Sequence, residues 1–260
     1  MLIIAVLMLC TCQQAVVVHE NAQWRGENRD GVYNETGLLK VWPAAGPQLL
    51  WSYQGLGDGY TSVSVANGKV YVTGKPGDDE LVLFVFDLTG KKITEKVVGK
   101  EWNTRYPGTR CSVLVHEGKL YIGNSLGQLF CLDEKTLNEI WKKDGINDFD
   151  GRNIMFGMTE NPLIVGDKIF MTPGGVRNNM VALNKDTGAL IWSSAGAGTV
   201  STYCSPLFID GYSVQLVVTY MATDTPGGRG APNDNKLVAF NANTGEVVWT
   251  ITQTSATHIT

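Results

Sequence analysis

The sequence predicts an all-β fold, a β-propeller built from four-stranded antiparallel blades. Two observations predict it: a segment of about fifty residues recurs along the chain, and 30 of the 260 residues are glycine without any low-complexity tract. Frequent glycines between short alternating runs are typical of strands joined by tight turns. Because one four-stranded sheet cannot bury both of its faces, copies of such a unit must stack on one another. The repeat therefore predicts blades arranged around an axis.

The most regular part of the repeat is a turn that combines an Asx residue, a Thr-Gly pair and a Trp. The Asx residues are 46, 51 and 57 residues apart; they are Asp87, Asp133, Asn184 and Asn241. The turn glycines are Gly90, Gly188 and Gly245, and the residues that follow an Asx by eight positions are Trp141, Trp192 and Trp249. Asx hydrogen bonds and a left-handed glycine suit such a turn. We interpret the Trp as a wedge between neighbouring blades, rather than a ligand-stacking platform, because it recurs in one register.

A hairpin precedes each of these turns and completes the unit. The hairpins lie at residues 63–74, 113–123 and 163–172, with a looser fourth copy at 206–220. In the first three, apolar runs flank Asn-Gly, Glu-Gly or Gly-Asp dipeptides, which supply the positive φ of two-residue turns. The units fall near residues 52–98, 102–143, 155–194 and 200–252, inside a domain over 22–260, and the first unit lacks the Trp. The chain therefore holds about four blades.

The first residues predict export. Residues 1–10 form an uninterrupted apolar stretch, and polar residues follow from Gln13. This stretch is too short to span a bilayer and suits a secretory signal over residues 1–18, although it carries no Lys or Arg. Cys10 and Cys12 lie where a bacterial lipoprotein carries its lipid-bearing cysteine. We therefore expect an exported protein, either periplasmic or anchored to the outer membrane through a lipid, with a buried N-terminal strand as the alternative.

The N-terminal block and the Asx turn resemble one family. Residues 24–31, 36–42, 46–51 and 55–62, which include Trp-Arg-Gly-Glu-Asn-Arg-Asp-Gly and Gly-Pro-Gln-Leu-Leu-Trp, are similar to bacterial "PQQ-binding-like β-propeller repeat" proteins. The Asx-x-x-Thr-Gly-x-x-x-Trp turn resembles the pyrroloquinoline quinone (PQQ)-like repeat, which also occurs in quinoprotein alcohol dehydrogenases and in the lipoprotein scaffold of outer-membrane assembly. Such propellers carry seven or eight blades. The resemblance implies an incomplete ring, with a small closed ring or two mutually completing chains as alternatives.

The resemblance also implies a catalytic alternative, a quinone-dependent oxidation. In quinoprotein alcohol dehydrogenases a disulfide between adjacent cysteines packs on PQQ, and a calcium ion held by Glu, Asn and Asp polarises it. The cysteines beyond the signal are odd in number and not adjacent: Cys111, Cys131 and Cys204. The loop with Asp148, Asp150 and Asn153 lacks a calcium-loop spacing, and Arg152 would oppose a cation. We predict no catalytic residue, no metal site and no cofactor; PQQ and calcium enter only under a quinoprotein alternative.

The charge of the chain limits its partners. The formal net charge is −4 and the isoelectric point is about 5.4, and both argue against binding of nucleic acid or anionic lipid. Contact with a membrane is then expected only through an N-terminal lipid. The partner is expected to be an envelope protein or a small molecule, and the sequence leaves the oligomeric state open.

The loops that link one blade to the next are the predicted binding region. They span residues 55–61, 100–110, 143–161 and 195–205, and loops on a rigid scaffold are where binding groups concentrate. The candidate ligand- or partner-binding residues are Tyr60, Trp102, Arg105, Arg110, Arg152, Glu160 and Tyr203. The arginines suit bidentate contacts to a carboxylate or another anion. Alternatively, they pair with Asp148, Asp150 and Glu160 and brace the loops.

Two functional hypotheses follow. The first is a non-catalytic binding or scaffold propeller of the bacterial envelope, supported by an intact repeat without a catalytic constellation. The second is a PQQ-dependent, quinoprotein-type oxidoreductase acting on alcohols or sugars, whose cofactor ligands are missing from this chain.

Overall fold

The computed structural model describes residues 21–197, 200–211, 213–222 and 235–253. Within them the chain forms four antiparallel sheets of four strands, each in sequential order. This confirms the predicted all-β propeller with about four blades. The predicted signal, with Cys10 and Cys12, lies outside the described residues. No helix among the described residues is long and apolar enough to cross a membrane.

The strands have the following bounds. Blade 1 contains β1 (Ser64–Ala66), β2 (Lys69–Gly74), β3 (Glu80–Asp87) and β4 (Lys92–Lys100). Blade 2 contains β5 (Leu114–His116), β6 (Lys119–Gly123), β7 (Gln128–Asp133) and β8 (Glu139–Asp144). Blade 3 contains β9 (Leu163–Val165), β10 (Lys168–Met171), β11 (Met180–Asn184) and β12 (Leu190–Ser194). Blade 4 contains β13 (Leu207–Ile209), β14 (Leu216–Met221), β15 (Asn235–Asn241) and β16 (Val247–Gln253).

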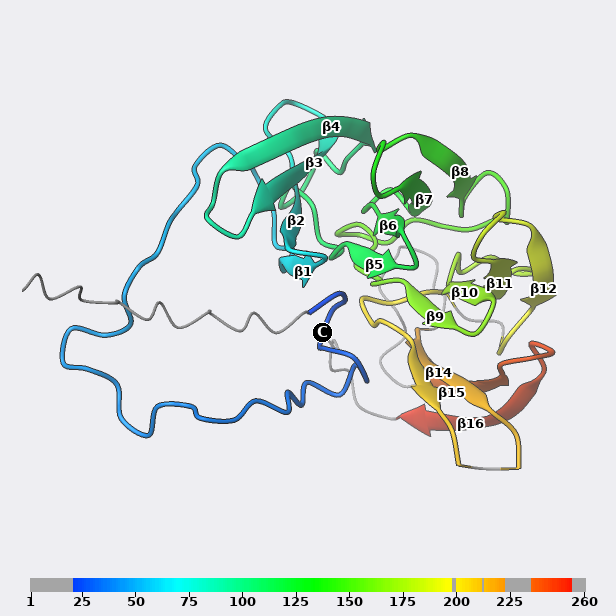
Figure 1. The fold of residues 1–260 in the computed structure, drawn as a ribbon. Helices are drawn as coiled ribbons and strands as arrows, with labels where there is room; N and C mark the ends of the chain where they lie inside the picture. The colour runs from blue at the N-terminus through cyan, green and yellow to red at the C-terminus, as the bar shows by residue number, and fades with distance from the viewer. Residues whose placement is uncertain (1–20, 198–199, 212, 223–234, 254–260) are drawn as a thin grey trace, which may run out of the picture.

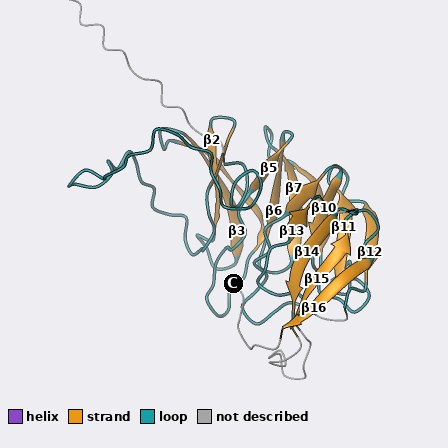
Figure 2. Cartoon of the chain, turned by 90° about the horizontal axis from the view of Figure 1, so that it is seen from below, coloured by secondary structure: helices purple, strands orange, loops and turns teal. Residues whose placement is uncertain are grey.

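The four blades form a fan around the N-terminal segment. Figure 1 shows β1, β5 and β9 on the inner side of the fan and β4, β8, β12 and β16 on its outer side. The innermost strands of neighbouring blades touch, β1 against β5 and β9 against β13. Viewed from below, the sheets of blades 2 to 4 stand side by side (Figure 2). Apolar faces of neighbouring blades meet, and three core clusters are each shared by two blades. Two further clusters lie on the end blades, one on blade 1 against Trp51 and Tyr53 and one within blade 4.

The Asx turns form because one side-chain oxygen satisfies several donors. Oδ1 of Asp133 accepts hydrogen bonds from the amide of Thr136 at 2.7 Å and from its hydroxyl at 2.8 Å. Oδ1 of Asn184 accepts the same pair from Thr187, both at 3.0 Å. The amide and hydroxyl of Thr136 favour the ionised carboxylate and lower the pKa of Asp133. Local chemistry therefore fixes this turn in each blade.

Each turn glycine lies under the Trp of the preceding blade. A Cβ on Gly188 would lie 2.8 Å from the ring of Trp141, and one on Gly245 would lie 2.5 Å from Trp192. The indole Nε1 atoms donate to carbonyls of the same turns, Trp141 to Lys185 at 3.0 Å and Trp192 to Ala242 at 3.1 Å. Both Trp side chains are buried. The glycine is needed because no side chain fits between the turn and the ring.

A fourth Trp of this kind occurs before the first repeat, where the sequence analysis did not assign it. Trp51 lies on Gly90, with 2.4 Å from a built Cβ to the ring, and its Nε1 donates to the carbonyl of Leu88 at 3.1 Å. Between blades 1 and 2 the pattern is absent on both sides. Thr94, which pairs with Val85 as Trp141 pairs with Cys131, stands where the Trp would be. Leu137 takes the glycine position with φ 57° and is buried in the shared core.

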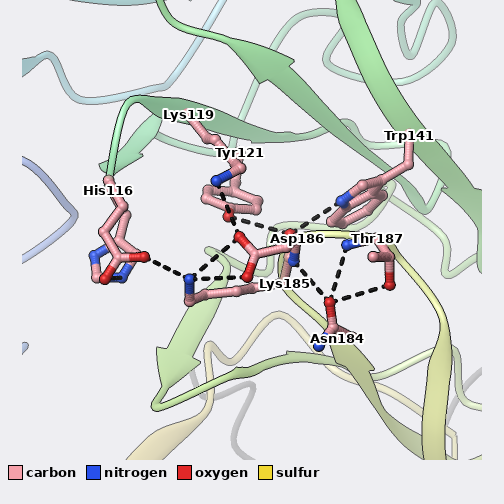
Figure 3. A network of polar contacts seen from close by, with 9 residues as sticks. His116, Lys119, Tyr121, Trp141, Asn184, Lys185, Asp186 and Thr187 are labelled. Carbon is pink, nitrogen blue, oxygen red and sulfur yellow. Dashed lines mark hydrogen bonds and ion pairs between the residues drawn. The ribbon is translucent and has the colours of Figure 1, made fainter.

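Beside the Trp contacts, polar side chains join the hairpin turn of one blade to the Asx turn of the next. Figure 3 shows this network between blades 2 and 3. The buried ammonium of Lys185 lies 2.5 Å from Glu117 and 3.2 Å from Asp186. The Tyr121 hydroxyl donates to the Lys185 carbonyl at 3.2 Å. These bonds lie on the face of the propeller opposite the blade-linking loops, because hairpin and Asx turns alternate with those loops along antiparallel strands.

Alanine at Gly188 should destabilise the protein more than alanine at Gly118. Both glycines have a positive φ, 68° and 71°, so each substitution incurs the left-handed penalty of about 1–2 kcal/mol. Only Gly188 lies under a Trp, and overpacking there should cost about 1–3 kcal/mol more. Urea unfolding of Gly188→Ala and Gly118→Ala measures the difference in unfolding free energy. Equal losses would contradict the role assigned to the Trp–Gly contact.

Candidate functional site

Aromatic side chains from all four predicted linker loops meet in one row. The ring of Tyr106 packs edge-on against Phe156 at 5.7 Å between centroids, and Phe156 packs against Tyr203 at 6.0 Å. The guanidinium of Arg110 lies 5.4 Å from the centre of the Tyr60 ring. We call Tyr60, Tyr106, Arg110, Phe156 and Tyr203 the aromatic row. It extends across the loop ends of the propeller and draws on all four linker loops.

The row combines exposed rings with a strained backbone. Tyr60 is 63% exposed and Tyr106 is 66% exposed. Tyr106 has φ 53°, a conformation that a bulky residue adopts only when its surroundings impose it. The amide of Phe156 donates to the Tyr203 hydroxyl at 3.3 Å, which joins the third and fourth linker loops. The rings are thus held in place while their faces stay accessible to solvent.

Arg110 holds its own loop. Its guanidinium donates to the carbonyl of Gly108 at 2.7 Å, to the hydroxyl of Ser125 at 3.2 Å and to the carbonyl of Tyr106. These acceptors differ from the carboxylates that the bracing alternative named. Arg105 and Arg152 have exposed side chains, and the carbonyl of Arg105 accepts the indole hydrogen of Trp102 at 2.8 Å. The structure thus gives Arg110 a bracing role through carbonyls.

In the acidic loop between blades 2 and 3, the side-chain oxygens accept hydrogen bonds from other groups of the protein. Asp150 pairs with Arg177 at 3.4 Å and accepts from Asn178 at 2.8 Å, and the Asn178 bond is the main cause of its lowered pKa. Oδ2 of Asp148 accepts the amide of Asp144, and Oδ1 of Asn153 accepts the amide of Ile154. A calcium site needs six to eight oxygen ligands, so this loop does not fit the ion. Within the described ranges no three His, Cys, Asp or Glu side chains are grouped to hold a metal.

The described cysteines do not fit a quinone site either. Cys111, Cys131 and Cys204 are free thiols, and Cys111 and Cys131 are buried. Burial raises the pKa of the Cys111 thiol far above its usual range, which keeps it protonated. No adjacent pair exists to pack on a cofactor, so no chemical step through PQQ can be derived from these residues.

The N-terminal segment joins all four blades at the inner side of the fan. Asn21 pairs with Val65 of β1, and the amide of Val115 in β5 donates to the Ala22 carbonyl at 2.8 Å. The buried guanidinium of Arg29 donates to the carbonyls of Pro162 at 2.6 Å, Asn161 at 3.1 Å and Pro206 at 3.3 Å. In the sequence this segment stands out only as a family motif. Its role depends on contacts between residues far apart in the sequence, more than 130 residues for those of Arg29, which no local pattern signals.

Glu160 is half-buried as a residue, and its carboxyl is directed into the interior of the propeller. Its Oε1 accepts the amide of Thr172 at 3.1 Å, and it lines a small pocket of about 30 Å³ with Thr172 and Met158. That volume suits a water molecule or two. Burial raises the pKa of Glu160 to about 7, against the opposing charge of Arg29. Glu160 therefore belongs to the interior of the scaffold.

Comparison with known proteins places this fold among two kinds of propeller. Residues 156–260 match the family model described as outer membrane protein assembly factor BamB. The chain is 28% identical over 146 residues to a quinoprotein ethanol dehydrogenase of Pseudomonas aeruginosa, covering 55% of this chain and 22% of that protein. It is 23% identical over 175 residues to BamB of Shewanella oneidensis, covering 64% of this chain and 41% of that protein.

A solved structure shows the same architecture. The quinohemoprotein alcohol dehydrogenase of Comamonas testosteroni superposes with a TM-score of 0.59 at 18% identity, over 81% of this chain and 38% of that one. At this identity the likeness concerns the fold alone. The chain spans less than half the length of each of these relatives.

The buried carboxyl of Glu160 predicts a pH-dependent stability. Its folded pKa of about 7 exceeds the usual 4.5, so between these values the folded protein keeps a proton that the unfolded chain releases. Stability should therefore fall as the pH rises through this window. The Glu160→Gln variant should gain up to about 3 kcal/mol relative to wild type between these pH values.

Urea unfolding of both proteins at several pH values measures this difference. Glu139→Gln, on an exposed position of β8, is the matched control and should show no such trend. A constant difference between wild type and Glu160→Gln would contradict the buried, raised carboxyl.

Proposed function

We propose that this chain, a β-propeller similar to the PQQ-type propellers, is a non-catalytic binding or scaffold protein of the bacterial envelope. It presents its loop face to a protein or small-molecule ligand. The observation that carries the proposal is the aromatic row, to which all four linker loops contribute. Exposed Tyr rings offer large contact area with a polar tip and lose little conformational entropy on binding.

The scaffold beneath the row supports binding more than chemistry. Arg110 holds the loop of Tyr106, and Asp150 is tied to Arg177 and Asn178. Cys111 is buried and protonated. Groups that would serve as ligands or nucleophiles are thus used within the described scaffold, while the aromatic surface stays accessible.

Export is part of the proposal. It is supported by the apolar stretch at residues 1–10. It is also supported by the match of residues 156–260 to the family model described as outer membrane protein assembly factor BamB. Lipid attachment at Cys10 or Cys12 would then fix the propeller to the membrane surface.

The second candidate is a quinoprotein-type oxidoreductase acting on alcohols or sugars. It is supported by the quinoprotein ethanol dehydrogenase relative. It would require PQQ and calcium ligands other than the described cysteines and the acidic loop around Asp150.

A photoreactive residue at position 106 should crosslink to the natural ligand or partner in cells that make the protein. The exposed ring of Tyr106 lies in the aromatic row, so a bound partner would contact it. The matched control is Ile140, 44% exposed on the outer strand β8. Mass spectrometry of the two samples should find products specific to position 106. Identical products from both positions would contradict a binding face.

Titration with PQQ separates the two candidates. The purified protein should show no saturable change in tryptophan fluorescence or heat with PQQ, with or without calcium, because the acidic loop and the cysteines do not fit these ligands. Trp102 beside the aromatic row provides a local signal. Saturable, calcium-dependent binding at micromolar strength would favour the oxidoreductase instead.

A further inference from the structure

A series of hydrogen bonds joins the third linker loop to the fourth, and it begins in the aromatic row. The amide of Phe156 donates to the Tyr203 hydroxyl at 3.3 Å. The hydroxyl of Thr159 donates to the Tyr203 carbonyl at 2.8 Å, and the amide of Asn161 donates to the Ser205 hydroxyl at 3.0 Å. Because these contacts follow one another along the chain, the place of the Phe156 ring depends on how the residues up to Asn161 are held.

The side chain of Glu160 attaches the same loop to blade 3. Its Oε1 accepts the amide of Thr172, directly after β10, at 3.1 Å. The Thr172 side chain is buried, with 4% of the residue exposed, and its hydroxyl has no hydrogen-bond partner within the described residues. Both residues line the pocket of about 30 Å³. A neutral carboxyl suits this pocket, whereas a carboxylate there is costly unless a cation or water contacts it.

The charged and titratable groups that face Glu160 come from other segments of the chain. They are Arg29 of the N-terminal segment, Cys111 before β5 and Cys204 of the fourth linker loop. The hydrogen bonds of Arg29 go to backbone carbonyls. Burial lowers the pKa of Arg29 to about 10 and raises the pKa of both thiols, so none of the three changes its charge at or below neutral pH. Glu101 also faces Cys111, but its carboxyl accepts two backbone amides.

We infer that Glu160 is a proton-controlled latch of the third linker loop, which holds the loop on blade 3 when its carboxyl is protonated and releases it when the carboxyl is ionised. Release brings the carboxyl into water and carries the Phe156 ring away from Tyr106 and Tyr203. The latch thereby regulates the aromatic row, and this consequence rests on the binding function proposed above.

The direction of the effect follows from the two environments of the carboxyl. The pKa of Glu160 is about 7 in the closed loop, where burial raises it, and returns to the usual 4.5 once water reaches the group. The closed loop therefore keeps a proton that the open loop gives up, so the open fraction should rise as the pH increases between these values. The rise should approach about tenfold per pH unit within this range and cease above it.

Hydrogen exchange of the full chain at about pH 5 and about pH 7.5, corrected for intrinsic exchange rates, tests the latch. The amides of residues 156–161 and of Thr172 should lose protection by at least about tenfold at the higher pH. The amides of β6 and β7 should change much less, because the loop opens without unfolding the blades. Glu160→Gln keeps an acceptor for the Thr172 amide but cannot ionise, so its loop should show no such change. The exposed control Glu139→Gln should behave as wild type.

Three results would overturn the latch. They are unchanged protection of the wild-type loop, a pH-dependent loss that persists in Glu160→Gln, and an equal loss in β6 and β7, which would assign the proton effect to global unfolding. Crosslinking from position 106 separates this inference from the proposed function. Specific products together with pH-independent exchange would keep the binding face and remove its latch. A pH-dependent loop without such products would keep the latch and remove the binding face.

Discussion

The contact between a Trp and the turn glycine of the next blade is the constraint on which the arrangement depends. A single blade cannot bury both of its faces from water. The Trp side chain covers the outer part of the interface between two blades. It combines a large apolar area, a ring placed where only glycine fits, and a hydrogen bond from Nε1 to a carbonyl. Because the glycine is also the left-handed residue of the Asx turn, one residue serves both the local turn and the packing between blades.

The interface between blades 1 and 2 shows that the two partners change together. Thr94 occupies the Trp position, and Leu137 occupies the glycine position in spite of φ 57°. A leucine in that conformation carries a backbone penalty, which its burial among the core residues of both blades offsets. The Trp is therefore one of two solutions to the same packing problem, and the glycine is required only where the Trp is present.

The repeat, the strands and the turn chemistry could be predicted because their signals are local in sequence. Trp51 was missed because it precedes its partner turn without a repeat of its own. Phe156 carries no polar group that marks it as a binding residue, although an aromatic residue between two tyrosine-bearing loops was a usable signal. Glu160 and Arg29 required the fold itself, since each depends on carbonyls, amides or charges from other blades.

The N-terminal segment limits how this propeller can recognise a ligand. Arg29 links the linker loops that lead into blades 3 and 4, and Asn21 and Ala22 pair with the inner strands of blades 1 and 2. The chain's own residues therefore occupy part of the inner side of the fan, and the pocket beside Glu160 has room for little more than water. Under the proposed binding function, recognition would fall to the exposed loop ends, where separate rings held by separate blades suit an extended partner surface better than an enclosed small molecule.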